Sequence, residues 1–375
     1  MSRFRWSILS ISVLSSGLLL SGCSLSGPQS TFDSVAFVAQ KQMSLLYFTT
    51  WLSLIVILGV GGVLAYSVFR YRSRSQDDEI PAQTHGNTVV EVGLILLATV
   101  ITVIIAIPTV RTNFQTEIRV TPTEDDIVVN VTGHQWWWAL EYPDEGIITA
   151  NELHVPVGKR VILNLTSADV LHSFWVPQLA GKRDLIPNQD NQLWLITEDE
   201  DGNQIPEGVY FGQCAELCLG AHAYMRFRVV VESEEDYEAW LGSFQTIEPL
   251  ASGTQLQQVQ NDPLIAKGQE LFKSKGCAAC HAVKGFAGGA PDKPDLTNFG
   301  LRTTVAAGVL DNTPENLARW LRDPQEVKPT NYMPTLWSED DPNREAEIEA
   351  LVAYLLNLGT TEDETQASLG GNYGN

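Results

Sequence analysis

Two long apolar segments constrain the fold of this chain more than any other feature of its sequence. They run from about residue 45 to 69 and from about 89 to 110, and a helix of about 20 residues is enough to cross a bilayer. The connection RYRSRSQDDEI, residues 70–80, places three arginines at the membrane edge, and such loops stay in the cytoplasm. We therefore expect a two-helix transmembrane hairpin within residues 23–111, with both ends outside the cytoplasmic membrane.

One acidic residue, Glu91, lies near the start of the second apolar segment. A carboxylate at the end of a membrane helix can reach the headgroups, while acids within membranes also serve on proton paths. The sequence leaves both interpretations open, so Glu91 is a candidate for a proton path.

The first residues have the pattern of an export signal. Arg3 and Arg5 precede an apolar run from residue 8 to 20, and the sequence LSGC ends at Cys23. This pattern resembles a bacterial lipoprotein signal, which implies removal of residues 1–22 and attachment of lipid to Cys23. An ordinary signal peptide and a first transmembrane helix are the alternatives. We expect a protein of the bacterial inner membrane, in contact with membrane lipid, whose later domains lie on the outer, periplasmic side.

The rest of the chain changes character along its length. Residues 112–244 contain short β-branched and apolar runs separated by turn residues, which is typical of an antiparallel β-sandwich or barrel. Residues 245–261 are polar and predict a linker, residues 262–360 carry helix start and stop signals, and residues 361–375 predict a disordered tail. The net charge of −21 makes nucleic acid a poor partner. We expect a membrane-anchored multidomain protein with a β domain and a small α domain.

The sequence CAACH at residues 277–281 has the spacing of the attachment site for c-type haem. Cys277 and Cys280 would form the two thioethers, and His281 would be the proximal axial ligand. A redox dithiol and half of a zinc site compete with this interpretation, but the domain has no other Cys or His to complete a zinc site. Met333, the methionine of this domain, is the candidate sixth ligand. The domain resembles the all-α class I cytochromes c.

The stretch CAELCLGAHAYM concentrates soft metal donors in twelve residues. Cys214 and Cys218 precede His222 and Met225, and a further imidazole comes earlier, at His172. Two thiols, two imidazoles and a thioether form a set that selects copper. The set holds one thiolate more than a single blue-copper ion needs, and a small disulfide is the alternative.

Together with DVLHSFWVP and GHQWWWALEYPD, this stretch resembles the cupredoxin-like CuA domain of cytochrome c oxidase subunit II. The resemblance implies two copper ions with these ligands: the bridging thiolates of Cys214 and Cys218, the imidazoles of His172 and His222, the thioether of Met225 and the backbone carbonyl of Glu216. It also implies that the Glu216 carboxylate reaches a magnesium or manganese ion shared with subunit I, and that electrons are accepted through Trp136. With the haem segment, it covers nearly the whole chain as a subunit II with a fused C-terminal cytochrome c domain.

Two positions depart from the pattern of this family. Leu219 stands where glycine is usual, so the ligand loop is expected to bend differently. The second apolar segment lacks the Trp-Thr and central proline that usually follow the glutamate, so Glu91 matches by position only. Of the remaining histidines, His134 is expected beside the electron-accepting aromatics, and His85 and His154 on the surface.

The resemblance implies a function in electron transfer. Electrons would enter at the fused haem, pass to the copper pair and continue to subunit I of a proton-pumping haem-copper terminal oxidase, where oxygen becomes water. Subunits I and III, and a donor that is a small redox protein or a quinol-oxidising complex, are the expected partners. Fusion would replace a diffusional encounter with a tethered one. The alternatives are the CuA subunit of a nitric oxide reductase and a membrane-anchored copper chaperone or cytochrome, although a chaperone explains neither His222 nor Met225.

Overall fold

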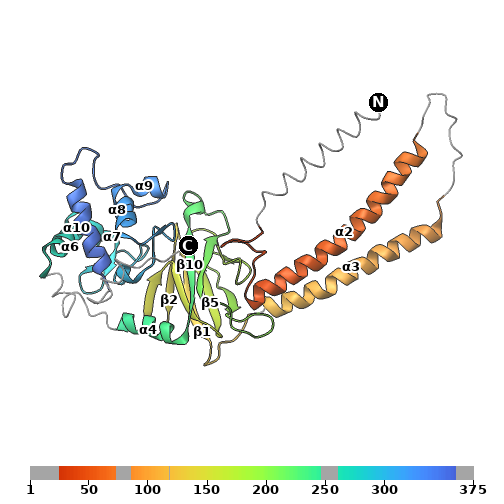
Figure 1. The fold of residues 1–375 in the computed structure, drawn as a ribbon, viewed down its shortest axis with the longest axis horizontal. Helices are drawn as coiled ribbons and strands as arrows, with labels where there is room; N and C mark the ends of the chain where they lie inside the picture. Colours follow the sequence, from red (N-terminus) through yellow and green to blue (C-terminus); the bar gives the residue numbers. More distant parts are fainter. Residues whose placement is uncertain (1–24, 73–85, 118, 246–260, 360–375) are drawn as a thin grey trace.

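The structure, a computed structural model, describes residues 25–72, 86–117, 119–245 and 261–359. The predicted signal peptide with Cys23, the predicted tail, His85 and most of the predicted linker lie outside these residues. Figure 1 shows a helical hairpin that extends from one side of a β domain and a helical domain on the opposite side. The predicted architecture of hairpin, β domain and cytochrome-like domain is confirmed.

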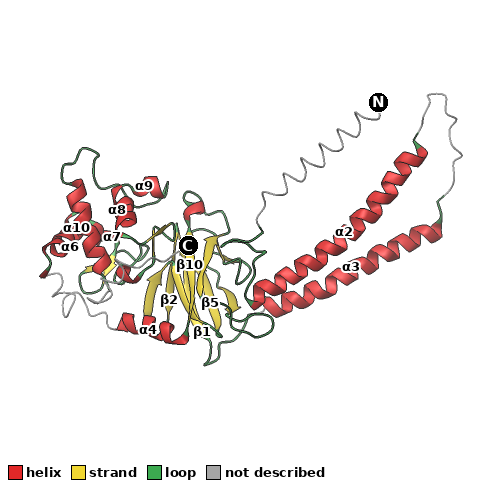
Figure 2. Cartoon of the chain, in the orientation of Figure 1, coloured by secondary structure: helices red, strands yellow, loops and turns green. Residues whose placement is uncertain are grey.

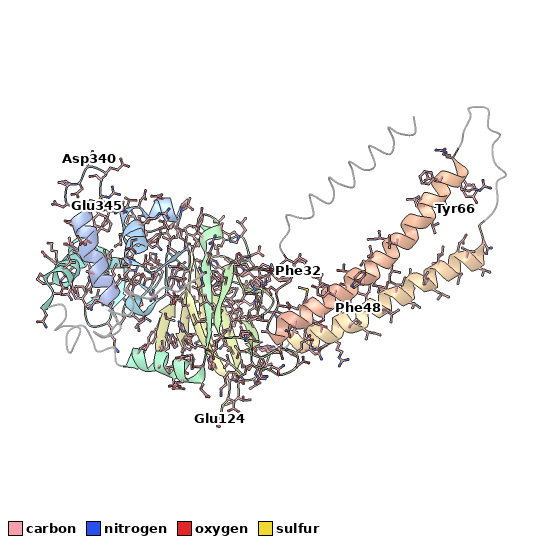
Figure 3. All side chains as sticks on the ribbon, in the orientation of Figure 1. Phe32, Phe48, Tyr66, Glu124, Asp340 and Glu345 are labelled. Carbon is pink, nitrogen blue, oxygen red and sulfur yellow. The ribbon has the colours of Figure 1, made fainter. Side chains whose placement is uncertain are left out.

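The hairpin consists of α2 (Phe37–Tyr71) and α3 (Thr88–Thr116), which run side by side away from the β domain. Both helices are long and apolar enough to cross a membrane. The Asn87 side chain accepts hydrogen bonds from two backbone N–H groups of the first turn of α3, and such an N-cap fixes where the helix begins. Phe48 and Tyr66 of α2, labelled in Figure 3, are exposed, as lipid-facing side chains would be.

The first turns of α2 are held by the β domain, and for this reason the helix begins at Phe37 and not near residue 45. Ala36, Val38 and Met43 are buried. The Phe37 ring stacks on the ring of Trp194, with 6.4 Å between the centroids. The base of the hairpin is therefore fixed to the β domain, ahead of the segment that is apolar enough to enter lipid.

The β domain is a sandwich of two five-stranded sheets (Figure 2). In spatial order, the first sheet contains β3 (Ile147–Ala150), β2 (Trp137–Tyr142), β1 (Ile127–His134), β5 (Arg160–Ser167) and β8 (Asn191–Ile196). The second contains β4 (Glu152–Pro156), β10 (Arg226–Glu232), β9 (Gly208–Cys214), β6 (His172–Trp175) and β7 (Arg183–Leu185). The pairs β1–β5 and β4–β10 are parallel and the others are antiparallel. The predicted sandwich is thus mixed, because strands that are not consecutive along the chain are free to pair in parallel.

An aromatic cluster fills the core of the sandwich near one end. Trp138 is fully buried, and its ring meets the rings of Phe174 and Phe227 edge to face, both at 5.4 Å between centroids. The Trp138 centroid also lies 6.0 Å from that of His172. This aromatic cluster therefore packs against one of the expected copper ligands, His172.

The helical domain follows α4 (Glu234–Gln245), the last helix of the β domain. Its helices are α6 (Pro263–Ser274), α7 (Cys277–Cys280), α8 (Pro314–Arg322), α9 (Pro324–Val327) and α10 (Arg344–Asn357), with a 3-10 turn η2 (Phe299–Leu301). Two short hairpins, β11 (Ala282–Val283) with β12 (Ala287–Gly288) and β13 (Thr304–Val305) with β14 (Leu310–Asp311), complete it. Helices α6 and α10 cross closely at Gly268, where a Cβ atom would lie 2.0 Å from the Ala350 carbonyl oxygen. Both helices of this crossing contribute side chains to the core of the helical domain.

Candidate metal centre and haem cavity

The expected copper ligands meet at one end of the sandwich. The sulfurs of Cys214 and Cys218 lie 3.7 Å apart, and His172 Nδ1 lies 3.9 Å from the Cys214 sulfur. The Cys218 sulfur lies 3.5 Å from His222 Nδ1 and 3.8 Å from Met225 Sδ. The two sulfurs are too far apart for a disulfide, whose S–S bond is about 2.05 Å. The donor set and its convergence fit soft metal ions such as copper.

The strand order explains this convergence. His172 begins β6 and Cys214 ends β9, and the two strands are paired with Phe174 opposite Cys214. The chain then forms a loop and the 3-10 turn η1 (His222–Tyr224) before β10. The backbone N–H of Cys214 donates to the carbonyl of Met225 at 2.9 Å, which closes the base of the loop. A single strand pair and one loop therefore gather all five donor side chains.

His172 is oriented by its neighbours. Its Nε2 lies 2.7 Å from the Asp169 carboxylate, which leaves Nδ1 facing the Cys214 sulfur. A carboxylate behind a ligating histidine fixes the ring orientation and the position of the ring proton. Gly133 supplies the room, because a Cβ atom there would lie 2.8 Å from Cδ2 of the His172 ring.

The two buried thiols do not titrate alike. The hydrogen bond between their sulfurs lowers the pKa of Cys214 to about 4, with a further contribution from His172. The same bond, together with burial, raises the pKa of Cys218. Cys214 is therefore the thiol of this pair that ionises more readily, and the thiolate is the form of cysteine that binds metals.

The ligand loop bends through Leu219, which has a φ of 67°. This left-handed conformation costs a residue with a Cβ about 1–2 kcal/mol, and it explains why glycine is the usual residue at this position in the family that the loop resembles. The side chain of Leu219 is exposed, so no steric clash with the core prevents the bend.

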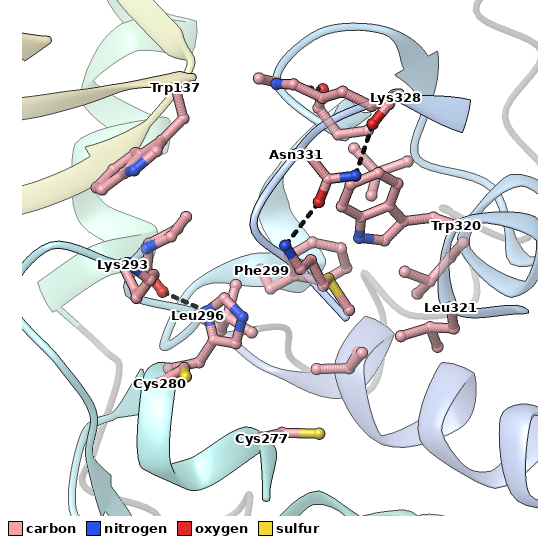
Figure 4. A pocket seen from close by; sticks show the side chains of 18 of the residues that line it. Trp137, Cys277, Cys280, Lys293, Leu296, Phe299, Trp320, Leu321, Lys328 and Asn331 are labelled. Carbon is pink, nitrogen blue, oxygen red and sulfur yellow. Dashed lines mark hydrogen bonds between the residues drawn. The ribbon is translucent and has the colours of Figure 1, made fainter. Parts of the chain in front are cut away.

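The helical domain contains a large cavity lined by the CAACH segment (Figure 4). Cys277, Cys280, His281 and Met333 all line it. Its other walls are largely apolar and include Phe272, Leu296, Phe299, Leu317, Leu321, Leu351 and Leu355. An apolar cavity bordered by two thiols, an imidazole and a thioether fits a covalently attached haem.

Both expected axial ligands are held in place by hydrogen bonds. His281 Nδ1 lies 2.9 Å from the Pro294 carbonyl, which directs its Nε2 away from that bond. Burial lowers the pKa of His281, so the imidazole stays neutral as an iron ligand requires. The backbone N–H of Met333 donates to Asn331 Oδ1 at 2.7 Å, and its carbonyl accepts from Gln325 Nε2 at 3.0 Å.

The β domain forms one wall of the same cavity. Gln135, Trp136 and Trp137, from the connection between β1 and β2, line it together with Asn151. Trp136 Nε1 donates to the Cys218 carbonyl at 2.9 Å. Trp137 instead stacks on His134, with 4.5 Å between ring centroids. Trp136 therefore joins the haem cavity to the copper-ligand loop, and His134 lies beside the aromatic residues of this wall.

The family of the chain follows from comparison with known proteins. The model of the cytochrome c oxidase subunit II periplasmic domain matches residues 147–233, and the cytochrome c model matches residues 265–359. A cytochrome c oxidase subunit 2 from Alkalihalophilus pseudofirmus is 36% identical over 82% of this chain and 86% of its own length. The chain belongs to the cytochrome c oxidase subunit 2 family.

A second member of this family matches a similar share of the chain. The subunit 2 from Bacillus sp. (strain PS3) is 35% identical over 88% of this chain and 91% of its own length. The solved periplasmic domain of subunit II of the cytochrome oxidase of Bradyrhizobium japonicum is 28% identical over 33% of this chain and 97% of its own, with a TM-score of 0.30. The family assignment rests on the sequence relatives, which extend through both domains. As a member of this family, the chain is part of a haem-copper oxidase, an oxidoreductase complex.

Two acidic site residues expected from the sequence, Glu216 and Glu91, have different surroundings in this subunit 2. The Glu216 carbonyl is 3.2 Å from the Cys214 sulfur, while its exposed carboxylate lies 3.7 Å from Lys182 Nζ. Among all His, Cys, Asp and Glu side chains in the described part of the chain, one group of three has donor atoms close enough to share a metal ion. It consists of His172, Cys214 and Cys218. Glu91 is exposed in the first turn of α3, where the helix dipole favours a negative charge.

A second contact between the domains was not predicted from the sequence. The buried Glu152 carboxylate of β4 accepts hydrogen bonds from the backbone N–H of Thr303 at 2.9 Å, and from the N–H and hydroxyl of Thr304 at 2.7 and 2.6 Å. Lys328 Nζ, also buried, donates to the Trp136 carbonyl at 2.5 Å. The cytochrome domain of this subunit 2 is therefore docked on the copper domain by buried charges, in addition to being tethered.

The expectation that His154 lies on the surface was wrong. Only 6% of this residue is exposed, since its ring stacks on Trp240 at 4.3 Å and its Nδ1 lies 3.0 Å from the Glu232 carboxylate. Burial opposes its charge, but the neighbouring carboxylates of Glu152, at 3.9 Å, and Glu232, at 3.0 Å, raise its pKa. His154 thus supports the Glu152 carboxylate from behind, a role that needs a contact made only in the folded sandwich.

Proposed function

We propose that this chain is the subunit through which electrons enter a proton-pumping haem-copper terminal oxidase. When bound, one haem c and a pair of copper ions would supply one-electron chemistry, so that electrons from an outside donor reach the partner subunit that reduces oxygen to water. The protein residues would hold these groups, keep water away from them and fix their separation.

The copper pair would be held by the cluster at the end of the sandwich. The proposed ligands are the thiolates of Cys214 and Cys218, the imidazoles of His172 and His222, the thioether of Met225 and the carbonyl of Glu216. Cys214, Cys218, His172 and Met225 are buried, and exclusion of water favours the soft sulfur and nitrogen donors over water as ligands.

The haem would be attached through thioethers to Cys277 and Cys280 and ligated by His281 and Met333. Methionine–histidine ligation raises the reduction potential and leaves no open coordination position. The hydrogen bond of His281 to the Pro294 carbonyl supports this proposal, because it holds the ring in one orientation and one tautomer.

The observation that carries the proposal is the wall shared by the two domains. Trp136 borders the cavity that contains the haem-attachment cysteines, and its indole N–H is bonded to the carbonyl of Cys218. The same tryptophan thus borders the proposed haem site and is bonded to a residue of the proposed copper site. This arrangement fits transfer of electrons between the two groups, with Trp136 as the electron-transfer residue.

The proposed setting is the inner membrane of a bacterium, with the hairpin in residues 23–111 as its anchor. The copper domain (112–244), the linker (245–261) and the cytochrome domain (262–360) would lie on the periplasmic side. Subunits I and III and a small redox protein or quinol-oxidising complex are the proposed partners. We also propose lipid on Cys23, after removal of residues 1–22.

Two acidic residues have proposed roles at the contact with partner subunits and lipid. The Glu216 carboxylate would reach a magnesium or manganese ion shared with subunit I; its exposure and its position on the ligand loop support this role. Glu91 would lie at the membrane boundary, where it is available to a proton path.

The test uses the purified oxidase complex that contains the full chain. We expect two coppers that share one unpaired electron, detected by electron paramagnetic resonance, and one low-spin haem attached covalently to the chain. An electron delivered to this haem by a photoexcited ruthenium complex should then appear at the copper pair. A single copper per chain, or copper reduction that does not draw on the haem, would overturn the proposal.

A further inference from the structure

The residue before the proposed haem ligand Met333 reaches across the domain boundary. Tyr332 places its ring 4.8 Å from the ring of Trp136, centroid to centroid, at a tilt of 32°. Its hydroxyl donates to Gln135 Oε1 at 2.9 Å. The hydrogen bond joins residues 197 positions apart in the chain, and the ring contact is made to the next residue, Trp136.

The Gln135–Trp136 pair in turn converges on a single atom of the copper-ligand loop. Gln135 Nε2 and Trp136 Nε1 both donate to the carbonyl oxygen of Cys218, each at 2.9 Å. The side-chain amide of Gln135 therefore has its oxygen on the Tyr332 hydroxyl and its nitrogen on the Cys218 carbonyl. A continuous set of contacts runs from the haem-ligand loop to the copper-ligand loop.

The surroundings leave Trp136 little freedom. A Cβ atom on Gly220 would lie 2.3 Å from the Trp136 ring, so the loop backbone presses against one part of the ring. Lys328, from the same loop region as Tyr332, holds the Trp136 carbonyl. The Tyr332 ring completes this enclosure from the cytochrome side.

Burial does not account for the conformation of Tyr332, because 59% of the residue remains exposed. An exposed tyrosine is held in one place here by a ring contact and a hydrogen bond, both made to the other domain. The ring separation lies within the range of favourable aromatic pairs, about 4.5–7 Å. Within its own domain Lys293 Nζ lies 5.8 Å from the centroid of the Tyr332 ring, but the ring stacking and the hydrogen bond are both made to the copper domain.

We propose that Tyr332 is a positioning residue for electron transfer between the two domains: it holds the Met333 loop against Trp136 and, through Gln135, against the Cys218 carbonyl. This inference rests on the proposed function. Functional groups must be held to within about 0.5 Å by their supporting residues, and Tyr332 joins the Met333 loop to the two side chains that are bonded to the Cys218 carbonyl. Trp137 also borders the cavity but stacks on His134, so the route through Trp136 is the one that Tyr332 would secure.

The experiment compares Tyr332→Leu, Tyr332→Phe and Thr335→Val in the intact oxidase complex. An electron is delivered to the haem by a photoexcited ruthenium complex, and the rate of copper reduction is followed by near-infrared absorption. We expect Tyr332→Leu to slow this step several-fold, because electron transfer slows as the separation of the two groups increases and its route loosens, while the haem spectrum and reduction potential stay unchanged. Tyr332→Phe keeps the ring and should recover most of the rate.

Thr335→Val is the matched control. Thr335 lies on the other side of Met333 and its hydroxyl bonds to Asp323 at 3.1 Å, within the cytochrome domain. A parental rate in Tyr332→Leu overturns the inference, and so does an equal loss in Thr335→Val, which would indicate a general effect on the loop. Absence of transfer in the parent complex would instead overturn the proposed function and this inference together.

Discussion

The copper cluster and the haem cavity are built in different ways. Five donor side chains of the copper cluster converge within one domain, on two paired strands and one loop, and neighbouring donor atoms are already within 3.5–3.9 Å. The haem cavity instead has walls from two domains, joined by the contacts of Glu152, Lys328 and Tyr332. A packed sheet can prearrange a small metal site, while a large cavity depends on the group that fills it and on docking.

The two domains should differ most in how their folding responds to loss of the bound copper or haem. Cys214→Ser with Cys218→Ser should abolish copper binding and leave the β domain folded, because its core does not depend on the metal. Cys277→Ala with Cys280→Ala should leave the cavity unfilled, so the cytochrome domain should lose its cooperative unfolding transition. Metal analysis measures the bound copper, haem staining measures the attached haem, and limited proteolysis reports whether each domain remains folded. Equal resistance of the two domains to protease in the second variant would contradict the comparison.

The buried cation Lys328 should make docking depend on pH. Burial lowers its pKa from 10.5 to about 7, so between these values the undocked state binds more protons and docking strengthens as pH rises. The gain is at most about 5 kcal/mol, since each pKa unit corresponds to about 1.4 kcal/mol. His154 has the opposite dependence on pH, because its pKa is raised in the folded protein. Its contribution to stability is fully present below about pH 6.5 and is lost as the pH rises through the folded pKa.

Lys328→Met should remove the alkaline gain. The reporter is hydrogen exchange of the Arg226 amide, which donates to the Ala307 carbonyl across the boundary at 3.2 Å, corrected for the intrinsic rate at each pH. Lys273→Met, on the exposed face of α6, is the control and should retain the gain. The same pH slope in both variants would show that Lys328 is not its source.

The next largest effect on docking is expected from loss of the Glu152 carboxylate, which accepts hydrogen bonds from Thr303 and Thr304. Glu152→Ala leaves three donors of Thr303 and Thr304 without their acceptor, and removal of one partner of a buried charged contact costs about 3–5 kcal/mol. Exchange of the Thr303 and Thr304 amides should accelerate, while copper content stays at the parental value. The control is Glu232→Gln, which alters the other carboxylate of His154 without touching the cytochrome domain. Unchanged exchange in Glu152→Ala would show that docking does not rely on this residue.

The smallest expected effect lies in the copper-ligand loop. Leu219→Gly relieves the left-handed strain of about 1–2 kcal/mol but adds the backbone entropy of glycine, about 0.5–1 kcal/mol. The thermal unfolding of the copper-loaded protein should therefore show a gain of about 0–1.5 kcal/mol in the free energy of unfolding. Leu217→Gly, also exposed and not left-handed, should lose stability instead. A loss in both variants would mean that Leu219 is not strained.

The donor residues of both sites could be proposed from the sequence because each set is dense along the chain. CAELCLGAHAYM holds four donor side chains within twelve residues, and CAACH holds three within five. Short loops bring such residues together whatever the rest of the fold does. The helices of the hairpin and of the cytochrome domain were predictable for the same reason. Their apolar and amphipathic patterns are local properties of the sequence.

The contacts between the domains could not be predicted in this way. Glu152 meets Thr304 across 152 positions, and Lys328 meets Trp136 across 192. No local sequence pattern marks these residues. The sequence around Lys328 does not distinguish it from a lysine on the surface. The parallel strand pairs and the burial of His154 were missed for the same reason: they depend on which distant strands become neighbours.

Trp136 is only 6% exposed, since the cytochrome domain covers it. If the domains stay docked during turnover, the exchange between them follows first-order kinetics and its rate does not vary with the concentration of any soluble carrier. Ionic strength, which screens encounters between separate charged proteins, should affect only delivery to the cytochrome domain. A soluble carrier would then have no direct access to the copper domain at Trp136, and the fused domain would select which carriers the oxidase can use.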